Sequence, residues 1–184
     1  MNQTVSDRRA EQIYAAGKAG GDFDYASGLN ELARLGEAEY LFRAGRLWPA
    51  FDHAKGLAEL ARLKNARFIY HAGLEWKSFD FNAGLGALLA IGDPPYVFYA
   101  GAYWKQFDFV RGVASLLQSG DCQYLYRAGT MWRTFDYGRA WKILESKVEQ
   151  AEQWRGLAFE NPRWRKALVE IWKAGFSAFR QTRR

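Results

Sequence analysis

The sequence predicts an all-α protein, an α-solenoid of about five two-helix repeats with a helical C-terminal cap. The prediction rests on aspartates and glycines that recur at a fixed spacing. Aspartates recur every 28 residues, one glycine series precedes them at a fixed offset, and a second follows them. Self-similarity at a period of about 20 to 50 residues is typical of stacked repeat arrays. The three series are Asp24, Asp52, Asp80, Asp108 and Asp136; Gly17, Gly45, Gly73, Gly101 and Gly129; and Gly28, Gly56, Gly84 and Gly112, the last of which is succeeded by Ala140.

The repeat boundaries follow from aligned aromatic positions. We expect one domain, 1–184, in which five helical hairpins cover residues 8–147 and a basic helical cap covers residues 148–184. The first unit is degenerate because Gly20 stands where later units have tryptophan, as expected of a terminal repeat that faces solvent. The aligned units begin at Gln12, Tyr40, Phe68, Tyr96 and Tyr124.

Each unit divides into two helices, because its apolar residues fall at steps of three and four rather than in strict alternation. Val97, Ala100 and Trp104 form one stripe of a first helix. The second helix follows the aspartate, which is a favoured N-cap, and Gly92 suits a helix C-terminus. Pro94 and the proline after it suit the first turn of the next helix. Helices of 10 or 11 residues are marginal alone, so stacking must supply most of their stability.

The first glycine of each unit lies inside a predicted helix, where glycine costs about 0.5–1 kcal/mol relative to alanine. We expect a neighbouring helix or a large ring of the adjacent unit to pack directly on this backbone; a ligand approaching the same glycines is the alternative. The repeated aspartates have two interpretations. They cap helices, or they form a row of carboxylates that binds cations or a basic peptide, and the distance of about 10 Å between stacked units favours capping.

The C-terminal segment departs from the 28-residue register. The stretch from Trp141 to Trp154 is expected to prolong the fifth unit's second helix, and a last helix is expected over 163–179. The Trp172-Lys-Ala-Gly175 sequence resembles part of the repeat. We expect the apolar positions of this helix to face the array and the basic positions to face water. The two sets are Trp164, Leu168, Ile171, Gly175 and Phe179, and Arg163, Arg165, Lys166 and Lys173.

Composition restricts the class of protein. With 49% hydrophobic and 17% aromatic residues, the chain can bury a continuous core. It contains no apolar run of membrane-spanning length and no signal-peptide pattern at its start, so we expect a cytoplasmic protein that does not associate with membranes. The single cysteine, Cys122, excludes an internal disulfide and a cysteine-rich zinc site.

A binding surface is expected where aligned positions vary, because such positions become neighbours on one face of a stack. Two rows qualify, and with Arg46 they are expected to form a basic and aromatic track on the first-helix face. Such a track can bind a protein or peptide; the alternative is a solvated face whose long side chains cover the core. The rows are Ala15, Arg43, His71, Tyr99 and Arg127, and Gly21, Pro49, Lys77, Lys105 and Arg133.

Nucleic acid is the alternative partner. Residues 1–136 contain equal numbers of acidic and basic side chains, so the net charge of +6 lies entirely in the remaining segment. Phosphate contacts from that segment, assisted by the basic and aromatic track, would make binding strongly salt-dependent. The candidate residues are Arg163, Arg165, Lys166, Arg180, Arg183 and Arg184. Self-association through an exposed end of the stack is a third hypothesis.

Catalysis is not indicated. His53 and His71 occupy different offsets within successive units, and the sequence contains neither a metal-binding His and carboxylate pattern nor a phosphate-binding glycine loop. We therefore expect no enzyme, no cofactor and no metal. In general architecture the chain resembles tetratricopeptide, HEAT and pentatricopeptide arrays, whose periods are longer. The resemblance implies an extended recognition surface and transfers no residue roles.

Overall fold

The computed structural model describes residues 5–147 and 149–181, with side-chain surroundings described as far as residue 175. These residues contain twelve helices and no strand, which confirms the all-α expectation. The helices are α1 (Val5–Ala19), α2 (Tyr25–Leu35), α3 (Ala38–Leu47), α4 (His53–Arg62), α5 (Ala66–Glu75), α6 (Phe81–Ile91), α7 (Pro94–Tyr103), α8 (Phe109–Ser119), α9 (Cys122–Met131), α10 (Tyr137–Ser146), α11 (Glu152–Glu160) and α12 (Pro162–Gln181).

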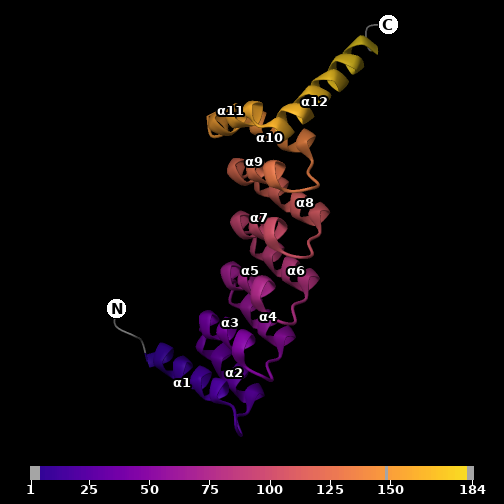
Figure 1. Cartoon of the computed structure of the whole chain (residues 1–184). Helices are drawn as coiled ribbons and strands as arrows, with labels where there is room; N and C mark the ends of the chain where they lie inside the picture. The colour runs from indigo at the N-terminus through magenta and orange to yellow at the C-terminus, as the bar shows by residue number, and fades with distance from the viewer. Residues whose placement is uncertain (1–4, 148, 182–184) are drawn as a thin grey trace.

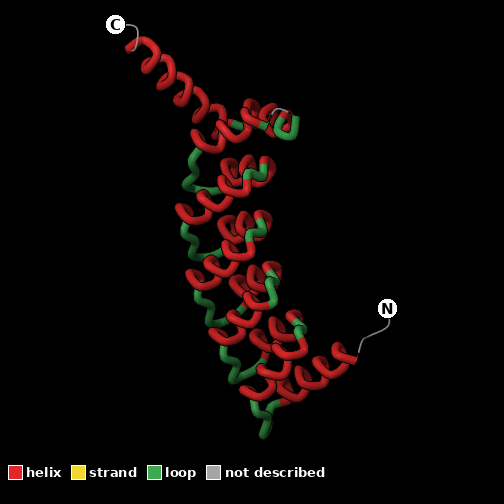
Figure 2. Tube along the Cα trace, turned by 180° about the vertical axis from the view of Figure 1, so that it is seen from behind, coloured by secondary structure: helices red, strands yellow, loops and turns green. Residues whose placement is uncertain are grey.

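Successive helix pairs lie above one another in an elongated, curved column (Figure 1). The odd-numbered helices α1 to α11 contact one another in order, and the even-numbered helices do so from α4 to α12. Connections within a pair and between pairs run along opposite edges of the column (Figure 2). Apart from α2, the helices of each pair therefore pack against each other and against the equivalent helices of the next pair, and the core continues from α1 into α12.

The repeated aspartates cap the second helices, as expected. The side chain of each accepts hydrogen bonds from backbone N–H groups in the first turn, for example from Ala83 N to Asp80 at 2.9 Å. Gly92 ends α6 in the left-handed conformation with φ 74°, and prolines occupy the first turn of α7. A second capping series stands before the first helices, where Asn65 and Asp121 accept from backbone N–H groups.

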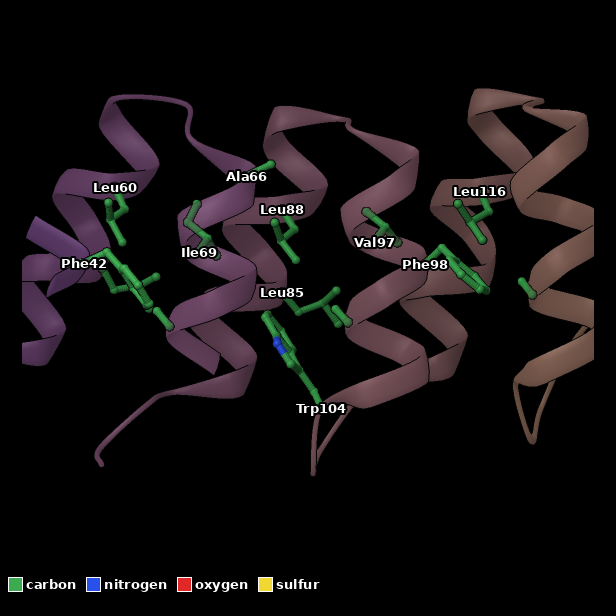
Figure 3. Packing of buried hydrophobic residues seen from close by; sticks show 14 of the residues in the cluster. Phe42, Leu60, Ala66, Ile69, Leu85, Leu88, Val97, Phe98, Trp104 and Leu116 are labelled. Atoms are coloured by element: carbon green, nitrogen blue, oxygen red, sulfur yellow. The ribbon is translucent and has the colours of Figure 1, made fainter. Parts of the chain in front are cut away.

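The first glycine of each pair receives a tryptophan ring from the next pair. A Cβ atom added to Gly73 would lie 2.4 Å from the indole of Trp104, and the indole N–H donates to the Tyr70 carbonyl at 3.0 Å. Figure 3 shows Trp104 extending from the end of α7 toward the preceding pair, beside Leu85. The same contact joins Trp48 to Gly17, Trp76 to Gly45, Trp132 to Gly101 and Trp164 to Gly129. We call this series the tryptophan ladder; it confirms the close-packing interpretation of the glycines.

A phenylalanine covers the second glycine of each pair. An added Cβ at Gly84 would lie 2.4 Å from the ring of Phe79, and the edge of Trp104 reaches the same glycine. The residue after each capping aspartate is also aromatic and lies against the ladder; the rings of Phe81 and Trp104 are 5.7 Å apart. One indole therefore packs between two glycine-bearing helices, which explains why both glycine series recur.

The C-terminal segment differs from expectation in two respects. Helix α10 ends at Ser146 rather than continuing to Trp154, and a separate helix, α11, packs on α9. The last helix buries Trp164 and Leu168, whereas Gly175 is exposed with open space around it. The Trp172-Lys-Ala-Gly175 sequence is therefore not a ladder element: Trp172 is 48% exposed, and α12 projects away from the column (Figure 1). Ile171 is half-buried, and the Phe179 side chain lies outside the described residues.

Candidate binding surfaces

The first-helix row, Arg43, His71, Tyr99 and Arg127, occupies one position on four consecutive first helices, α3, α5, α7 and α9. Both arginines lie over a ring of their own helix. The guanidinium carbon of Arg43 is 5.5 Å from the centroid of the Tyr40 ring, and that of Arg127 is 5.7 Å from the centroid of Tyr124. The row therefore presents cations that are held against aromatic faces.

A hollow of about 270 Å³ lies between α3 and α5 at one end of this row. Its floor is the stacked pair Phe42 and Phe68, with ring centroids 5.4 Å apart. Arg46 and Arg67 lie over these two rings at 5.6 and 5.5 Å. The hollow thus combines an apolar floor with a basic rim.

Carboxylates compensate much of the charge around this hollow. Arg43 pairs with Glu39 at 2.7 Å, and Arg46 pairs with Glu75 at 2.9 Å. His71 Nδ1 lies 3.8 Å from the same Glu75 carboxylate. Exposed ion pairs contribute little to stability, so their main effect here is to orient the guanidinium groups.

A cluster of tyrosines continues the row across α5, α7 and α9. The ring of Tyr99 lies 5.9 Å from Tyr70 and 6.4 Å from both Tyr103 and Tyr124. Burial, with smaller contributions from Tyr103 and Tyr99, raises the pKa of Tyr70; burial also raises the pKa of Tyr124. The raised pKa values keep the Tyr70 and Tyr124 phenols neutral at physiological pH. Tyr103, at 55% exposure, presents this cluster to solvent.

The second predicted row, Lys77, Lys105 and Arg133, lies outside the helices, directly after the ladder tryptophans, and all three side chains are exposed. Arg133 lies over the ring of Phe109 on α8, with 5.3 Å between guanidinium carbon and centroid. Within this row, Arg133 therefore borders α8, a second helix. We call Lys77, Lys105 and Arg133 the connecting row.

The basic C-terminal residues have different environments. Arg163 is exposed, as expected, and it also donates to the Thr130 carbonyl at 2.7 Å and to the carbonyl of Trp132, so it fixes α12 on the end of α9. Arg165 and Lys166 are exposed on α12. The Arg180 side chain, and Arg183 and Arg184 as a whole, lie outside the described residues.

The contacts of His53 and the burial of Cys122 fit a structural role for both residues. His53 Nε2 lies 3.0 Å from the Gly45 carbonyl oxygen. Tyr137 occupies the equivalent position three units later, where its hydroxyl donates to the Gly129 carbonyl. Cys122 is buried, and burial raises the pKa of its thiol. Throughout the described ranges, no three His, Cys, Asp or Glu side chains are grouped so that they could hold a metal ion.

Sequence reasoning did not find the hollow between α3 and α5, because Arg67, Phe42 and Phe68 lie outside the two variable rows. The contact of Arg133 with Phe109 on α8 was also missed, since it depends on the direction in which the connecting segment leaves α9. Comparison with protein-family models, curated proteins and solved structures finds no match for this chain. None of the described helices combines the length and apolar character needed to cross a bilayer.

Proposed function

We propose that the chain is an α-solenoid of five two-helix units with a C-terminal cap, and that it is a non-catalytic scaffold that binds a protein or peptide. In this proposal the single domain 1–184 acts in the cytoplasm without a cofactor. The first-helix row supports this proposal most directly. At one surface position of four consecutive first helices it holds Arg43, His71, Tyr99 and Arg127, each beside an aromatic ring.

The chemistry of this surface favours a polypeptide partner. Tyrosine and arginine are enriched at protein interfaces, where a ring supplies contact area and a guanidinium supplies directed hydrogen bonds. The glutamates beside Arg43 and Arg46 limit the positive charge of the surface, so it is suited to a partner with mixed apolar and acidic groups rather than to a uniform polyanion.

The proposal is tested by reversing charge in the row. Arg43→Glu combined with Arg127→Glu should abolish capture of the partner by immobilised protein, while the melting temperature stays unchanged, because both side chains are at the surface. The control variant, Arg165→Glu with Lys166→Glu on α12, carries the same change of charge and should capture normally. Unchanged capture by the first variant would overturn the assignment of this surface.

Nucleic acid is the second candidate, favoured by the exposed Arg165 and Lys166 and by half-exposed tyrosine rings on which bases can stack. Fluorescence anisotropy with mixed-sequence single- and double-stranded DNA and RNA tests it at low and near-physiological salt. Binding through phosphates should weaken steeply with salt, and further in Arg165→Gln with Lys166→Gln. Absence of binding at low salt would exclude this candidate. Arg163 is retained in these variants because it fixes α12.

A further inference from the structure

The hollow between α3 and α5 carries an excess of positive charge. Three arginines, two glutamates, one histidine and two phenylalanines line it. Arg43 and Arg46 each pair with one of the two glutamates, at 2.7 and 2.9 Å. The third arginine is Arg67, and no carboxylate in the described part of the chain pairs with it. With the histidine counted as neutral, the lining therefore has one positive charge in excess, and this charge belongs to Arg67.

The floor of the hollow orients the Arg67 guanidinium. Its central carbon lies 5.5 Å from the centroid of the Phe68 ring, and Phe68 itself is stacked on Phe42. A planar guanidinium that rests on a ring loses little rotamer freedom when its N–H fork donates to an acceptor. The Arg67 side chain is exposed, so an acceptor reaches this fork from solvent. Arg67 can therefore bind an anion while both glutamates keep their own partners.

The size of the charge excess indicates which anion fits. A carboxylate carries one negative charge, and its two oxygens match the guanidinium fork. A phosphorylated side chain carries about 1.5 to 2 negative charges near neutral pH, which exceeds the single charge that the lining leaves uncompensated. The hollow is therefore complementary to one carboxylate group.

An exposed apolar pair adjoins the hollow on the same helix, α5. The ion pair between Arg46 and Glu75 places residues 29 positions apart opposite each other on adjacent first helices. One unit further along, the equivalent positions hold Leu74 and Tyr103, which are 42% and 55% exposed. An apolar surface between α5 and α7 thus takes the place of the ion pair between α3 and α5. This continuation favours a polypeptide ligand over a small free acid, because only a longer ligand also covers the apolar pair.

We propose that the hollow binds the side-chain carboxylate of an aspartate or glutamate in a partner polypeptide, and that an apolar side chain of the same segment packs on Leu74 and Tyr103. This inference rests on the proposed scaffold function and names the chemistry that its partner presents. The Arg67 fork donates to the carboxylate, while Arg43 and Arg46 remain paired with their glutamates.

The test uses short Gly-Ser peptides that each carry one Glu and one Trp, in a series that varies the spacing between the two. Each peptide is titrated into the isotope-labelled full chain, and NMR follows the arginine Nε–H signals, which detect weak contacts at individual side chains. Comparison peptides replace Glu by Gln or by phosphoserine, or replace Trp by Ser.

Two protein variants remove the proposed contacts at exposed positions: Arg67→Gln for the carboxylate and Leu74→Ser for the apolar side chain. The matched controls are Arg34→Gln on α2 and Val110→Ser on α8. Both control residues are exposed, and both lie outside the hollow, the first-helix row and the connecting row. Melting temperatures verify that each variant is folded.

We expect at least one spacing of Glu and Trp to shift the Arg67 Nε–H signal saturably. Replacing Glu by Gln, or Arg67 by Gln, should weaken binding about tenfold. Leu74→Ser, or Ser in place of Trp, should weaken it about fivefold, and both controls should bind normally. Insensitivity to Arg67→Gln overturns the site. Tighter binding of the phosphoserine peptide than of the Glu peptide overturns the assignment to a carboxylate.

The inference and the proposed function fail separately, because Arg67 and Leu74 are not altered in the variant that tests the function. If no peptide of the series binds, but Arg43→Glu with Arg127→Glu still abolishes capture of the partner, the hollow does not hold an acidic side chain. The inference is then overturned, while the scaffold function stands.

Discussion

Two glycines of helix α6, Gly84 and Gly86, differ in what an added methyl group would meet. At Gly84 a Cβ would lie 2.4 Å from the Phe79 ring, whereas at Gly86 the nearest atom is Arg111 Nη2 at 3.6 Å. Gly84→Ala should destabilise the protein by about 1–3 kcal/mol through overpacking. Gly86→Ala should stabilise it by about 0.5–1 kcal/mol through helix propensity.

Equilibrium unfolding in urea measures both free energies on the same helix. Since the two substitutions have identical effects on helix propensity, their difference isolates the contact with Phe79 and Trp104. Equal changes in stability would show that the close packing at Gly84 does not limit the residue at that position.

Lys64 adopts a left-handed backbone conformation that is occupied by glycine in three other units. Its φ is 52°, and Gly36, Gly92 and Gly120 stand at the same place in the repeat with φ of 77°, 74° and 63°. The left-handed region costs an ordinary residue about 1–2 kcal/mol. Lys64→Gly should therefore raise the free energy of unfolding by about 1 kcal/mol, and Gly92→Lys should lower it by a similar amount. A loss of stability in Lys64→Gly would mean that contacts of the lysine outweigh its backbone strain.

At the scale of the helix, the N-terminus of α7 differs from those of α5 and α9. Asp93 makes no capping hydrogen bond through its side chain, whereas Asn65 and Asp121 at equivalent positions do. Burial raises the pKa of the Asp93 carboxyl. Because the folded-state pKa is raised, the contribution of this group to stability is greatest when it is protonated and is lost as pH rises through the folded pKa.

Asp93→Asn should accordingly raise the melting temperature at pH 7, and the gain should shrink toward zero as pH falls below the ordinary aspartate pKa of about 3.9. Thermal unfolding followed by circular dichroism over this pH range measures the effect. A gain of the same size at both ends of the range would attribute the stabilisation to the amide itself and not to removal of a buried charge.

The elements that could be predicted from sequence are those whose surroundings repeat. Each capping aspartate and each ladder glycine meets the same neighbours in every unit, so one physical argument covers five positions. The C-terminal segment has no such redundancy. The end of α10 at Ser146 and the backbone contacts of Arg163 depend on how α11 and α12 pack, which no local pattern specifies. Candidate surfaces were predicted by position, but the contact of Arg133 with α8 depends on the path of the connecting segment, which no local pattern specifies.

At the scale of the whole molecule, the tryptophan ladder has a defined beginning and end. The first unit has Gly20 in place of a tryptophan, so it receives a ring from the second unit and donates none. At the other end Ala158 is fully buried, like Ala128 before the ladder glycine of α9, but the next residue is Phe159. Its ring lies 5.4 Å from that of Trp141. A further tryptophan therefore finds no glycine on which to pack, and the ladder ends there.

Each ladder tryptophan joins two adjacent pairs. The position of a truncated tryptophan therefore determines which helices lose protection from hydrogen exchange. In a stacked helical array, as we propose for this chain, stability is close to a sum of unit and nearest-neighbour terms. Truncating a buried tryptophan costs about 3–5 kcal/mol. Trp48→Ala should destabilise only the terminal pair, α1 and α2. Trp104→Ala should allow α1–α6 and α7–α12 to unfold independently of each other.

Hydrogen exchange followed by mass spectrometry measures this difference directly. In Trp48→Ala we expect faster exchange confined to residues 5–35, and in Trp104→Ala faster exchange on both sides of the α6 to α7 boundary, with two separable unfolding transitions in urea. A single transition with uniformly faster exchange in both variants would contradict nearest-neighbour coupling. Such a result would mean that the continuous core binds all pairs into one cooperative unit, and a partner bound at α3 would then stabilise α10 as strongly as α4.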